Sequence, residues 1–455
     1  MKRLVFCFDG TWNKLNPDLA TNVVLTAASI QRTDDDGIAQ IIHYDEGVGT
    51  DELEKVRGGV FGQGLVKNLR EAYRFLIFNY DPGDEIYVFG FSRGAFSARS
   101  FIGLIRQVGP LERLHVGRID EAIKLYQDAE RGQSEADDEL RRFRSSYSGA
   151  VCIDVGDDAW RCGNVAGYQQ GQAPLLKIKF LGVWDTVGAL GWPKILPYDD
   201  WLNRNHAFHD ASVDAFVENA RHAVAIDERR KLFPVELMGD LSSLNRNRGF
   251  ADHDHKAPYQ ERWFPGDHGS VGGGGDIRQL SDSALAWVLI GAKRAGLRLD
   301  TNAGTRIHDF RPDPLASLDN ENEPSWSFTD LMKGDRDGPE HLWQLSPSAI
   351  RRWRTPGEKV TGGKYRPGTL ATVADQLDAM GALDFVPPTD LLDTVIVQPS
   401  DSLSKYAYRF YGNAELWPVI AAANSDTLDD PDEIFPGQSI RIPRKTDPSG
   451  GERLD

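Results

Sequence analysis

Short runs of hydrophobic residues alternate with longer amphipathic stretches along most of the chain. Runs of four to eight apolar residues bounded by turn residues are typical of strands buried on both faces. Apolar positions that recur every three or four residues are typical of helices that bury one face. This alternation predicts an α/β fold, with a mainly parallel sheet and helices on both of its faces. The expected strands are 3–8, 85–90 and 177–185, and the expected helices are 64–80, 95–108 and 281–296, the last opened by Ser281 as its cap.

The periodic pattern weakens after residue 311, where Pro, Gly, Asp and Asn become frequent. Such composition is typical of loops and turns rather than of long regular elements. Regular signals return at Asp393, in the order strand, helix, helix, strand. The expected parts are therefore a large domain 1–372 with a loop-rich periphery 311–372, a linker 373–392, a small α+β domain 393–443 and a flexible tail 444–455.

The pentapeptide GFSRG, residues 90–94, lies where an expected strand passes directly into an expected helix. A serine between two glycines at such a junction indicates a sharp turn whose flanking positions have no space for a side chain. The turn lifts the Ser92 hydroxyl above the edge of the sheet, near the positive end of the helix dipole. Ser92 is therefore the candidate nucleophile, and the backbone N–H of Arg93 is a candidate oxyanion donor.

A serine nucleophile needs a base that takes its proton and an acid that orients the base. In this architecture the acid and then the histidine follow the serine, at strand ends or in the loops after them. Asp185 ends the expected strand 177–185, and His268 lies in the glycine-rich sequence WFPGDHGSVGGGG. Asp185 and His268 are the candidate acid and base.

Each of these two assignments has a rival. His222 lies in ENARHAVAIDERR, a segment whose pattern predicts a helix, where a histidine is more often a structural hydrogen-bonding group. Asp9 ends the first expected strand, but its neighbours Gly10 and Thr11 fit a different role, the second backbone donor of the oxyanion hole.

Composition and charge exclude some classes of function. The formal net charge is −16 and the pI is near 5.1. A sequence-independent nucleic-acid binder needs a basic face, so no nucleic-acid partner is expected. Three cysteines without a CxxC spacing predict reduced thiols rather than a disulfide framework or a zinc cluster. The sequence DHDHK, residues 252–256, has metal-ligand residue types but is more typical of a solvated loop. We expect neither a metal nor a cofactor.

The N-terminal apolar run is five residues long and ends at Asp9, far short of a signal-peptide core. No apolar stretch approaches the length that crosses a bilayer. We therefore expect the protein to be made in the cytoplasm without a signal peptide.

Several motifs together give the chain from Met1 to about Leu370 a resemblance to a known family. It resembles the α/β-hydrolase-like catalytic domain of the type VI secretion phospholipase effectors. The motifs are FDGTWN (8–13), TNV (21–23), GVGT (47–50), GFSRGAFSAR (90–99), VWDTVGA (183–189), HAVAIDERR (222–230), WFPGDHGSVGGG (263–274) and YRPGTL (365–370). The chain departs from the family pattern at Asp267, where an apolar residue is common, and at Ser270, where an aspartate is common.

This resemblance implies a catalytic triad of Ser92, Asp185 and His268 and ester hydrolysis on lipids. It also implies an antibacterial effector that a non-classical secretion system exports to the periplasm of a target cell. The implied partners are a phospholipid or other ester substrate, the secretion apparatus and an immunity protein.

Residues 394–443 resemble a LysM module, a small domain that binds glycans containing N-acetylglucosamine. This second resemblance implies peptidoglycan or a chitin-like glycan as a partner, contacted by Asp401, Leu403, Tyr411 and Asn424. Ser400 stands where the family usually has a glycine. A spacer or docking role is the alternative, because a fold does not by itself imply binding.

The sequence thus favours a serine ester hydrolase, a phospholipase or carboxylesterase that works through an acyl-enzyme and carries a glycan-binding module. Two alternatives from other classes stay open. One is a polysaccharide or cell-wall deacylase, and the other is a non-catalytic glycan-binding scaffold.

Overall fold

Six parallel strands form the central sheet in a computed structural model of the chain. The strand order among the described residues is β2-β1-β3-β4-β5-β6. The strands are β1 (Arg3–Phe8), β2 (Gln40–Asp45), β3 (Glu85–Phe91), β4 (Ile178–Trp184), β5 (Ala220–Ala225) and β6 (Tyr259–Phe264). The structure describes residues 1–10, 20–47, 60–130, 136–188, 212–231, 233–275, 277–300, 312–318, 333–382, 388–398, 401–425, 428, 431, 434 and 438–444.

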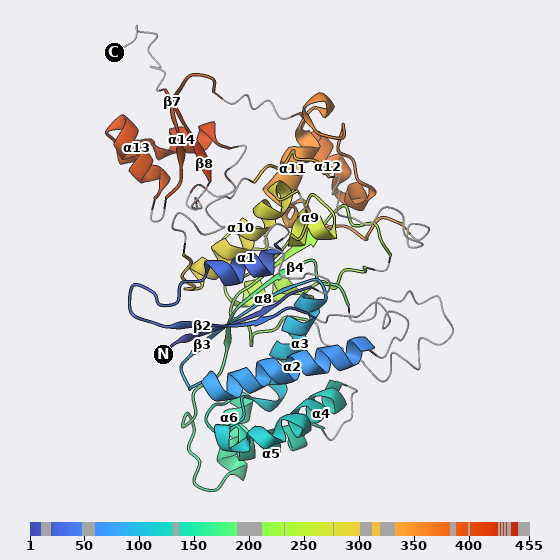
Figure 1. Ribbon diagram of the computed structural model, residues 1–455, viewed down its shortest axis with the longest axis vertical. Helices are drawn as coiled ribbons and strands as arrows, with labels where there is room; N and C mark the ends of the chain where they lie inside the picture. Colours follow the sequence, from blue (N-terminus) through green and yellow to red (C-terminus); the bar gives the residue numbers. More distant parts are fainter. Residues whose placement is uncertain are drawn as a thin grey trace.

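Successive residues of β1 enter two hydrophobic cores on opposite faces of the sheet. Leu4 and Phe6 belong to one core, and Val5 and Cys7 belong to the other. The first core is covered by α2 (Val60–Asn79), α3 (Arg93–Val108), α4 (Ile119–Glu130) and α5 (Ala136–Tyr147), with α6 (Val155–Asn164) beside them (Figure 1). The second is covered by α1 (Asn22–Ser29) and α10 (Gln279–Arg294), with the short α9 (His268–Gly272) at one end.

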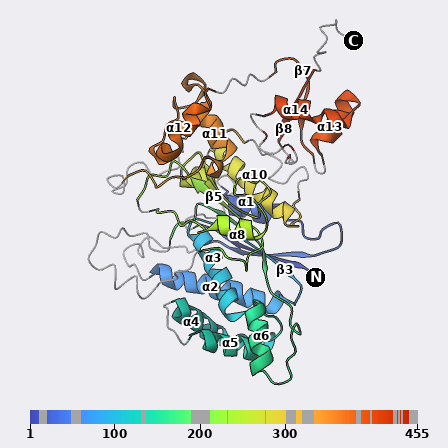
Figure 2. The ribbon, with the colours of Figure 1, turned by 180° about the vertical axis from the view of Figure 1, so that it is seen from behind.

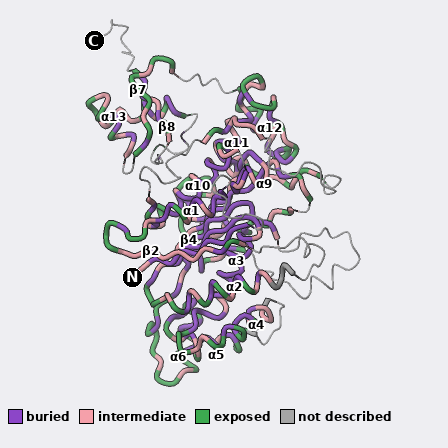
Figure 3. Tube along the Cα trace, viewed as in Figure 1, coloured by how far each residue is buried: buried purple, intermediate pink, exposed green. Residues whose placement is uncertain are grey.

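The view from behind in Figure 2 shows the same layers, helices on either side of the sheet. Figure 3 shows the interior of the sheet as buried, and β1, β3, β4 and β5 are buried along almost their whole length, whereas the edge strand β2 is half-buried in its middle. Strands covered on both faces read as continuous apolar runs, which explains why their sequences lack alternation. The expected α/β fold with a parallel sheet and helices on both faces is confirmed.

The carboxyl ends of all six strands lie on one edge of the sheet, because every strand pair is parallel. In open α/β sheets this is the edge where ligands and reacting groups are placed. Ser92 comes directly after β3 in the sequence, and Asp185 comes directly after β4. These two strands are neighbours in the sheet. The topology therefore brings the two residues to the same place.

A third core joins the end of the sheet to the segment 333–382. Val224 of β5 and Trp263 of β6 pack there against α11 (Pro347–Arg354), α12 (Ala374–Ala379) and the residues just before α12. Val373 and Leu377 are fully buried in this core. Both residues lie in the stretch 373–392 that was predicted as the linker, and the boundaries of that linker stay a prediction.

The small C-terminal unit has a core of its own. Its strands β7 (Leu391–Ile396) and β8 (Ser439–Pro443) pair in antiparallel fashion. Between them lie α13 (Leu403–Tyr411) and α14 (Trp417–Ala423), which gives the expected order strand, helix, helix, strand. The remaining described helices are α8 (Leu241–Asn247) and the 3₁₀ helices η1 (Arg113–Arg118), η4 (Leu342–Gln344), η5 (Gly357–Lys359), η6 (Gly368–Val373) and η7 (Ala414–Leu416).

Two details of the expected elements are wrong. Ser281 does not cap α10, because the helix begins at Gln279 and Ser281 lies in its first turn. The Ser281 hydroxyl donates to the carbonyl of Arg278, the residue at the N-cap position. The segment around His222 is strand β5, next to the edge strand β6, rather than a helix. In the part of the chain that the structure describes, no helix combines the length and hydrophobicity that crossing a bilayer demands.

Candidate active site

Ser92 occupies the single residue between the end of β3 and the start of α3. Its backbone φ is 59° and its ψ is −127°, a conformation that costs a non-glycine residue about 1–3 kcal/mol. A Cβ at Gly90 would lie 2.6 Å from the carbonyl oxygen of Gly94, and a Cβ at Gly94 would lie 2.3 Å from the carbonyl oxygen of Phe8. The predicted steric need for both glycines is confirmed.

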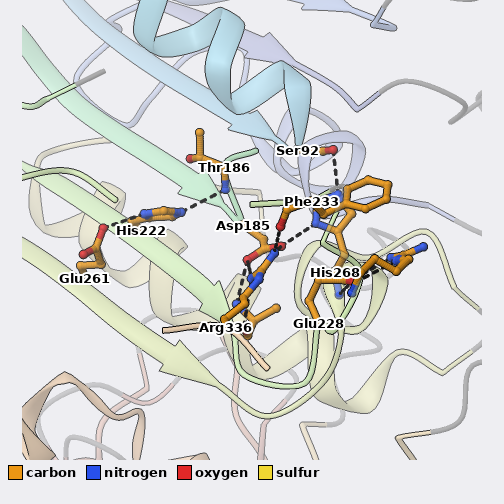
Figure 4. A network of polar contacts seen from close by, with 11 residues as sticks. Ser92, Asp185, Thr186, His222, Glu228, Phe233, Glu261, His268 and Arg336 are labelled. Atoms are coloured by element: carbon orange, nitrogen blue, oxygen red, sulfur yellow. Dashed lines mark hydrogen bonds and ion pairs between the residues drawn. The ribbon is translucent and has the colours of Figure 1, made fainter. Parts of the chain in front are cut away.

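The structure brings Ser92, His268 and Asp185 into one hydrogen-bonded chain (Figure 4). The Ser92 Oγ lies 2.7 Å from His268 Nε2, and His268 Nδ1 lies 2.6 Å from Asp185 Oδ2. An ionised carboxylate only accepts hydrogen bonds, so Nδ1 carries the imidazole proton and donates it to Asp185. Nε2 is then the acceptor for the serine hydroxyl. The arrangement can move a proton from Ser92 to His268.

This chain of three residues is enclosed. Ser92 is 6% exposed, His268 is 8% exposed and Asp185 has no exposed surface. The imidazole lies beside the rings of Phe91 and Phe233, with ring centroids 4.7 Å and 5.2 Å away. Because a low-polarity environment strengthens hydrogen bonds and charge interactions, the enclosure favours a defined imidazole orientation.

Asp185 is held by more groups than His268 alone. Its Oδ1 accepts the backbone N–H of Ala225 at 2.9 Å, and both of its oxygens accept from the guanidinium of Arg336. Burial by itself raises the pKa of Asp185, but the Arg336 charge and the His268 hydrogen bond outweigh it and hold that pKa well below its usual range. Among the described residues, Asp185 and Ser92 are the two non-glycine residues with positive φ.

Sequence reasoning missed Arg336. It lies 151 residues after Asp185, in the sequence GDRDGP, within the stretch that was predicted as loop-rich periphery. No periodicity or motif points to a single arginine in such a stretch. A conserved pairing signal from related sequences is the kind of information that could have found it.

His222 takes a structural place next to this site rather than a place in it. Its Nε2 accepts the backbone N–H of Thr186 at 3.1 Å, so Nδ1 carries the proton and donates to Glu261 Oε2 at 2.8 Å. The side chain has no exposed surface. His222 therefore fixes the backbone just after Asp185, and its geometry leaves no lone pair for Ser92.

The candidate oxyanion donors are the backbone N–H groups of Arg93, Gly10 and Thr11. Arg93 is the first residue of α3, directly after Ser92. The N–H of Gly10 donates to the carboxylate of Asp9 at 2.7 Å in this structure, and Thr11 lies outside the described residues. The same carboxylate accepts the hydroxyls of Thr21 and Tyr44 at 2.7 Å each, so Asp9 holds the end of β1 rather than His268. The oxyanion roles of Gly10, Thr11 and Arg93 stay predictions.

Asp267 and Ser270, the two departures from the family pattern beside His268, are joined by a hydrogen bond. The Asp267 Oδ1 accepts the backbone N–H of Ser270 at 2.7 Å, which caps the first turn of α9. Ser270 is buried, and a Cβ at Gly266 would lie 2.6 Å from its Cβ. A small residue at position 270 and a capping carboxylate at 267 therefore suit the tight turn that presents His268.

In the described stretches of the chain, no three His, Cys, Asp or Glu side chains are grouped so that they could hold a metal ion. Within the sequence DHDHK, the Asp252 Oδ2 lies 3.7 Å from Arg246 Nη1, and the Asp254 Oδ1 lies 4.0 Å from Nδ1 of its neighbour His255.

The four residues predicted to contact glycan lie differently in the C-terminal unit. Leu403 and Asn424 are buried, and the Asn424 amide bonds to the backbone of Ile420 and Arg441. Asp401 accepts from Gln398 N–H and the Tyr406 hydroxyl, and the Tyr411 hydroxyl donates to the carbonyl of Pro443 at 2.7 Å. Leu403 and Asn424 thus stabilise the module from inside, and glycan contacts from all four residues stay predictions.

Comparisons with known proteins assign both parts of the chain to families. Residues 2–290 match the model of the family described as "T6SS, Phospholipase effector Tle1-like, catalytic domain", which is well over half of the chain. The chain belongs to the Tle1-like effector family. Residues 395–443 match the LysM domain, so this Tle1-like catalytic domain is followed by a LysM module.

Similar proteins share parts of this Tle1-like chain. The uncharacterized protein YEL023C of Saccharomyces cerevisiae is 27% identical over 279 residues, 56% of this chain and 36% of its own. The potassium binding protein Kbp of Escherichia coli is 36% identical over 76 residues, 17% of this chain and 47% of its own. The matched part is thus less than half of either relative.

Two solved structures are also similar to the chain. An uncharacterized protein from Pseudomonas aeruginosa has a TM-score of 0.42 and 16% identity, covering 93% of this chain and 62% of its own. The Tle1 effector bound to the VgrG spike of the type 6 secretion system has a TM-score of 0.31 and 18% identity, covering 60% of this chain and 51% of its own.

Proposed function

We propose that the protein is a serine ester hydrolase that cleaves acyl esters of lipids through a triad of Ser92, His268 and Asp185. The observation that carries this proposal is the hydrogen-bonded chain from Ser92 Oγ through the imidazole to Asp185 Oδ2. Membership of the Tle1-like phospholipase effector family supports a lipid ester as the substrate. The strained backbone of Ser92 supports a nucleophile rather than a packing serine, since such strain is retained where it serves a site.

In the proposed reaction the Ser92 Oγ attacks the ester carbonyl while His268 Nε2 takes the hydroxyl proton. Asp185 holds the imidazole in the tautomer that leaves Nε2 free to accept, and it stabilises the imidazolium that forms. The imidazolium then gives its proton to the leaving alcohol, which leaves an acyl-enzyme on Ser92. Water, deprotonated by the same imidazole, attacks the acyl carbonyl, and the fatty acid departs as Ser92 regains its proton. The backbone N–H of Arg93 is the proposed donor to the oxyanion, and Gly10 could join it only by giving up its hydrogen bond to Asp9.

The LysM match supports a second part of the proposal, that the C-terminal unit binds peptidoglycan or another glycan containing N-acetylglucosamine. Cell-wall binding would hold the hydrolase near a membrane surface in the periplasm of a target cell. Family membership supports export by the type VI secretion apparatus, and a protein of that apparatus and an immunity protein are the proposed partners.

A second candidate function is deacylation of a polysaccharide. The observation that favours it is the same LysM module, which would deliver a glycan rather than a lipid to the hydrolase. The chemistry at Ser92 would be unchanged, because both substrates are esters that transfer an acyl group to the serine, although the acyl group and the leaving alcohol both differ.

The experiment that separates these functions offers the purified protein phospholipid vesicles, a chromogenic short-chain ester and an acetylated glycan. Release of fatty acid from the vesicles in a Ser92-dependent manner is the expected result. Release of acetate from the glycan alone would favour the deacylase, and no Ser92-dependent turnover of any ester would favour a scaffold without catalysis.

A further inference from the structure

The buried carboxylate of Asp185 faces two cationic or proton-donating groups rather than one. Arg336 Nη1 lies 2.6 Å from Asp185 Oδ1, and Arg336 Nη2 lies 3.0 Å from Oδ2, the oxygen that also accepts from His268 Nδ1. The arginine side chain is 7% exposed. Figure 4 shows the guanidinium and the imidazole approaching the carboxylate together. Arg336 and the proposed base His268 therefore bond to the same carboxylate.

The same guanidinium also fixes the backbone around the site. Nη1 donates to the carbonyl of Ala225 at 3.0 Å, at the end of β5, and Nη2 donates to the carbonyl of Phe233 at 2.8 Å. Phe233 is one of the two rings beside the imidazole. One side chain thus joins the acid, the adjacent strand end and a wall of the site, a geometry that the planar fork of arginine provides and lysine does not.

Arg336 comes from outside the part of the chain that matches the family model, which ends at residue 290. Its segment makes a second tie to the site through Tyr365, whose hydroxyl donates to Asp227 Oδ2 at 2.8 Å. The same oxygen accepts the N–H of Gly266, two residues before His268, at 2.7 Å. The stretch 333–382 therefore meets both the acid and the loop of the base.

The charge of Arg336 has two opposed effects on acyl transfer. It favours the ionised form of the buried Asp185, which must accept from His268 for the imidazole to keep its tautomer. It also opposes the positive charge that the imidazole gains when it takes the Ser92 proton, because like charges repel more strongly in a buried site. The charge of Arg336 therefore acts on both members of the Asp185–His268 pair.

We propose that Arg336 is a positioning residue of the Ser92 hydrolase, which locks the Asp185 carboxylate in place and sets the acidic limit of activity. This inference rests on the proposed function, and it adds the guanidinium charge of Arg336, which is not part of the triad. It also makes the segment 333–382 part of the catalytic unit.

The other charged groups on the elements around His268 stay in the chain when Arg336 is substituted. They are Glu228 and Arg230 in the loop after β5, Asp227 in the same loop, Asp267 before α9, Arg93 at the start of α3 and Asp185 itself. Glu228 accepts the backbone N–H of His268 at 3.4 Å and pairs with Arg230 at 2.6 Å, so its charge is already balanced.

The test measures kcat and KM for a chromogenic short-chain ester from pH 5 to 9 in the full chain and in two variants. Arg336→Gln removes both the fork and the charge, so the high-pH plateau of kcat should fall roughly 10- to 100-fold with little change in KM. The acidic limb of its profile should move to higher pH by about one unit, because protonation of the imidazole becomes easier. Arg336→Lys keeps the charge without the fork, so its plateau should fall while its acidic limb stays in place.

Arg354→Gln is the matched control, since Arg354 lies in the same segment and bonds to the carbonyls of Met380 and Gly381 instead of Asp185. Its profile should equal that of the unsubstituted chain. Thermal unfolding of every variant identifies any that has lost its fold.

A second readout does not depend on turnover. The His268 Nδ1 proton, hydrogen-bonded to a carboxylate, can be followed by downfield proton NMR while the imidazole is titrated. The titration should move to higher pH by about one unit in Arg336→Gln and stay in place in Arg336→Lys. If no ester is hydrolysed but this shift is seen, the proposed function fails and the role of Arg336 stands. An unmoved titration in folded Arg336→Gln, or an equal shift in Arg336→Lys, would overturn the role of the charge.

Discussion

His222 Nε2 accepts the backbone N–H of Thr186 at 3.1 Å, one residue after the proposed catalytic acid Asp185. Its other nitrogen bonds to Glu261, whose Oε2 also accepts the N–H of Met238. The rival histidine of the sequence is thus a clamp for the backbone that carries Asp185. A clamp and a base respond differently to substitution.

The substitution His222→Ala should reduce stability more than it reduces chemistry. It leaves the Thr186 N–H and the Glu261 carboxylate without their buried partner, which should lower the free energy of unfolding by about 2–4 kcal/mol. Turnover at a temperature where the variant is folded should fall far less than in His268→Ala, and urea unfolding together with ester kinetics measures both. A loss of turnover equal to that of His268→Ala, without loss of stability, would make His222 the base.

The substitution Gly94→Ala tests the turn that carries Ser92. The new Cβ would lie 2.3 Å from the carbonyl oxygen of Phe8 and 2.4 Å from that of Asp9, so β1 or α3 must shift. We expect a loss of about 2–4 kcal/mol in stability, as for overpacked cores, together with reduced turnover. Gly163→Ala in α6 is the control, because nothing lies within 4 Å of its added Cβ and alanine favours a helix. Equal unfolding midpoints for the two variants would contradict the packing argument.

The meeting of the candidate residues Ser92 and Asp185 was predictable because each comes directly after a strand. Ser92 and Asp185 follow β3 and β4, and a strand that ends in a glycine-flanked serine is visible in a single sequence. β5 was mistaken for a helix because ARHAVA is buried on both faces and so shows no alternation, while Ala and Arg favour helices. Arg336 was out of reach because its role arises only from tertiary contact across 151 residues.

The glycan residues show a similar limit. The order of elements in the LysM module followed from periodicity, but periodicity cannot say whether an asparagine near a helix end faces a ligand or the core. Asn424 bonds to the backbone of Arg441 in β8, so it joins α14 to the sheet. Its substitution by Ala is expected to unfold the module rather than to weaken binding selectively.

Chelation tests the expectation that the reaction uses no metal. A serine triad generates its nucleophile by proton transfer to histidine, so ester turnover should be unchanged after treatment with EDTA and dialysis. Atomic emission analysis of the treated protein verifies that metal has been removed. Loss of activity that calcium or zinc restores would bring Asp9 or the sequence DHDHK back into the mechanism.

Truncation after Val386 tests whether the two parts are separable. The core that contains Leu377 and the core that contains Val397 share no residue, so the shortened chain should fold and keep its turnover of a short ester. Retention on insoluble peptidoglycan or chitin should be lost, which a pull-down with both proteins measures. Equal retention of both would make the module a spacer, and loss of esterase activity would make it part of the catalytic unit.

The most direct test of the proposed mechanism is the rate of ester hydrolysis by Ser92→Ala beside the unsubstituted chain. Removal of a triad nucleophile costs about four to six orders of magnitude in kcat, and the small buried alanine should leave the fold intact. The result that we predict is a loss of this size with an unfolding midpoint at or above that of the unsubstituted chain. A folded Ser92→Ala variant that keeps more than about a tenth of the activity would contradict the triad, because removal of its nucleophile must lower kcat by far more than tenfold.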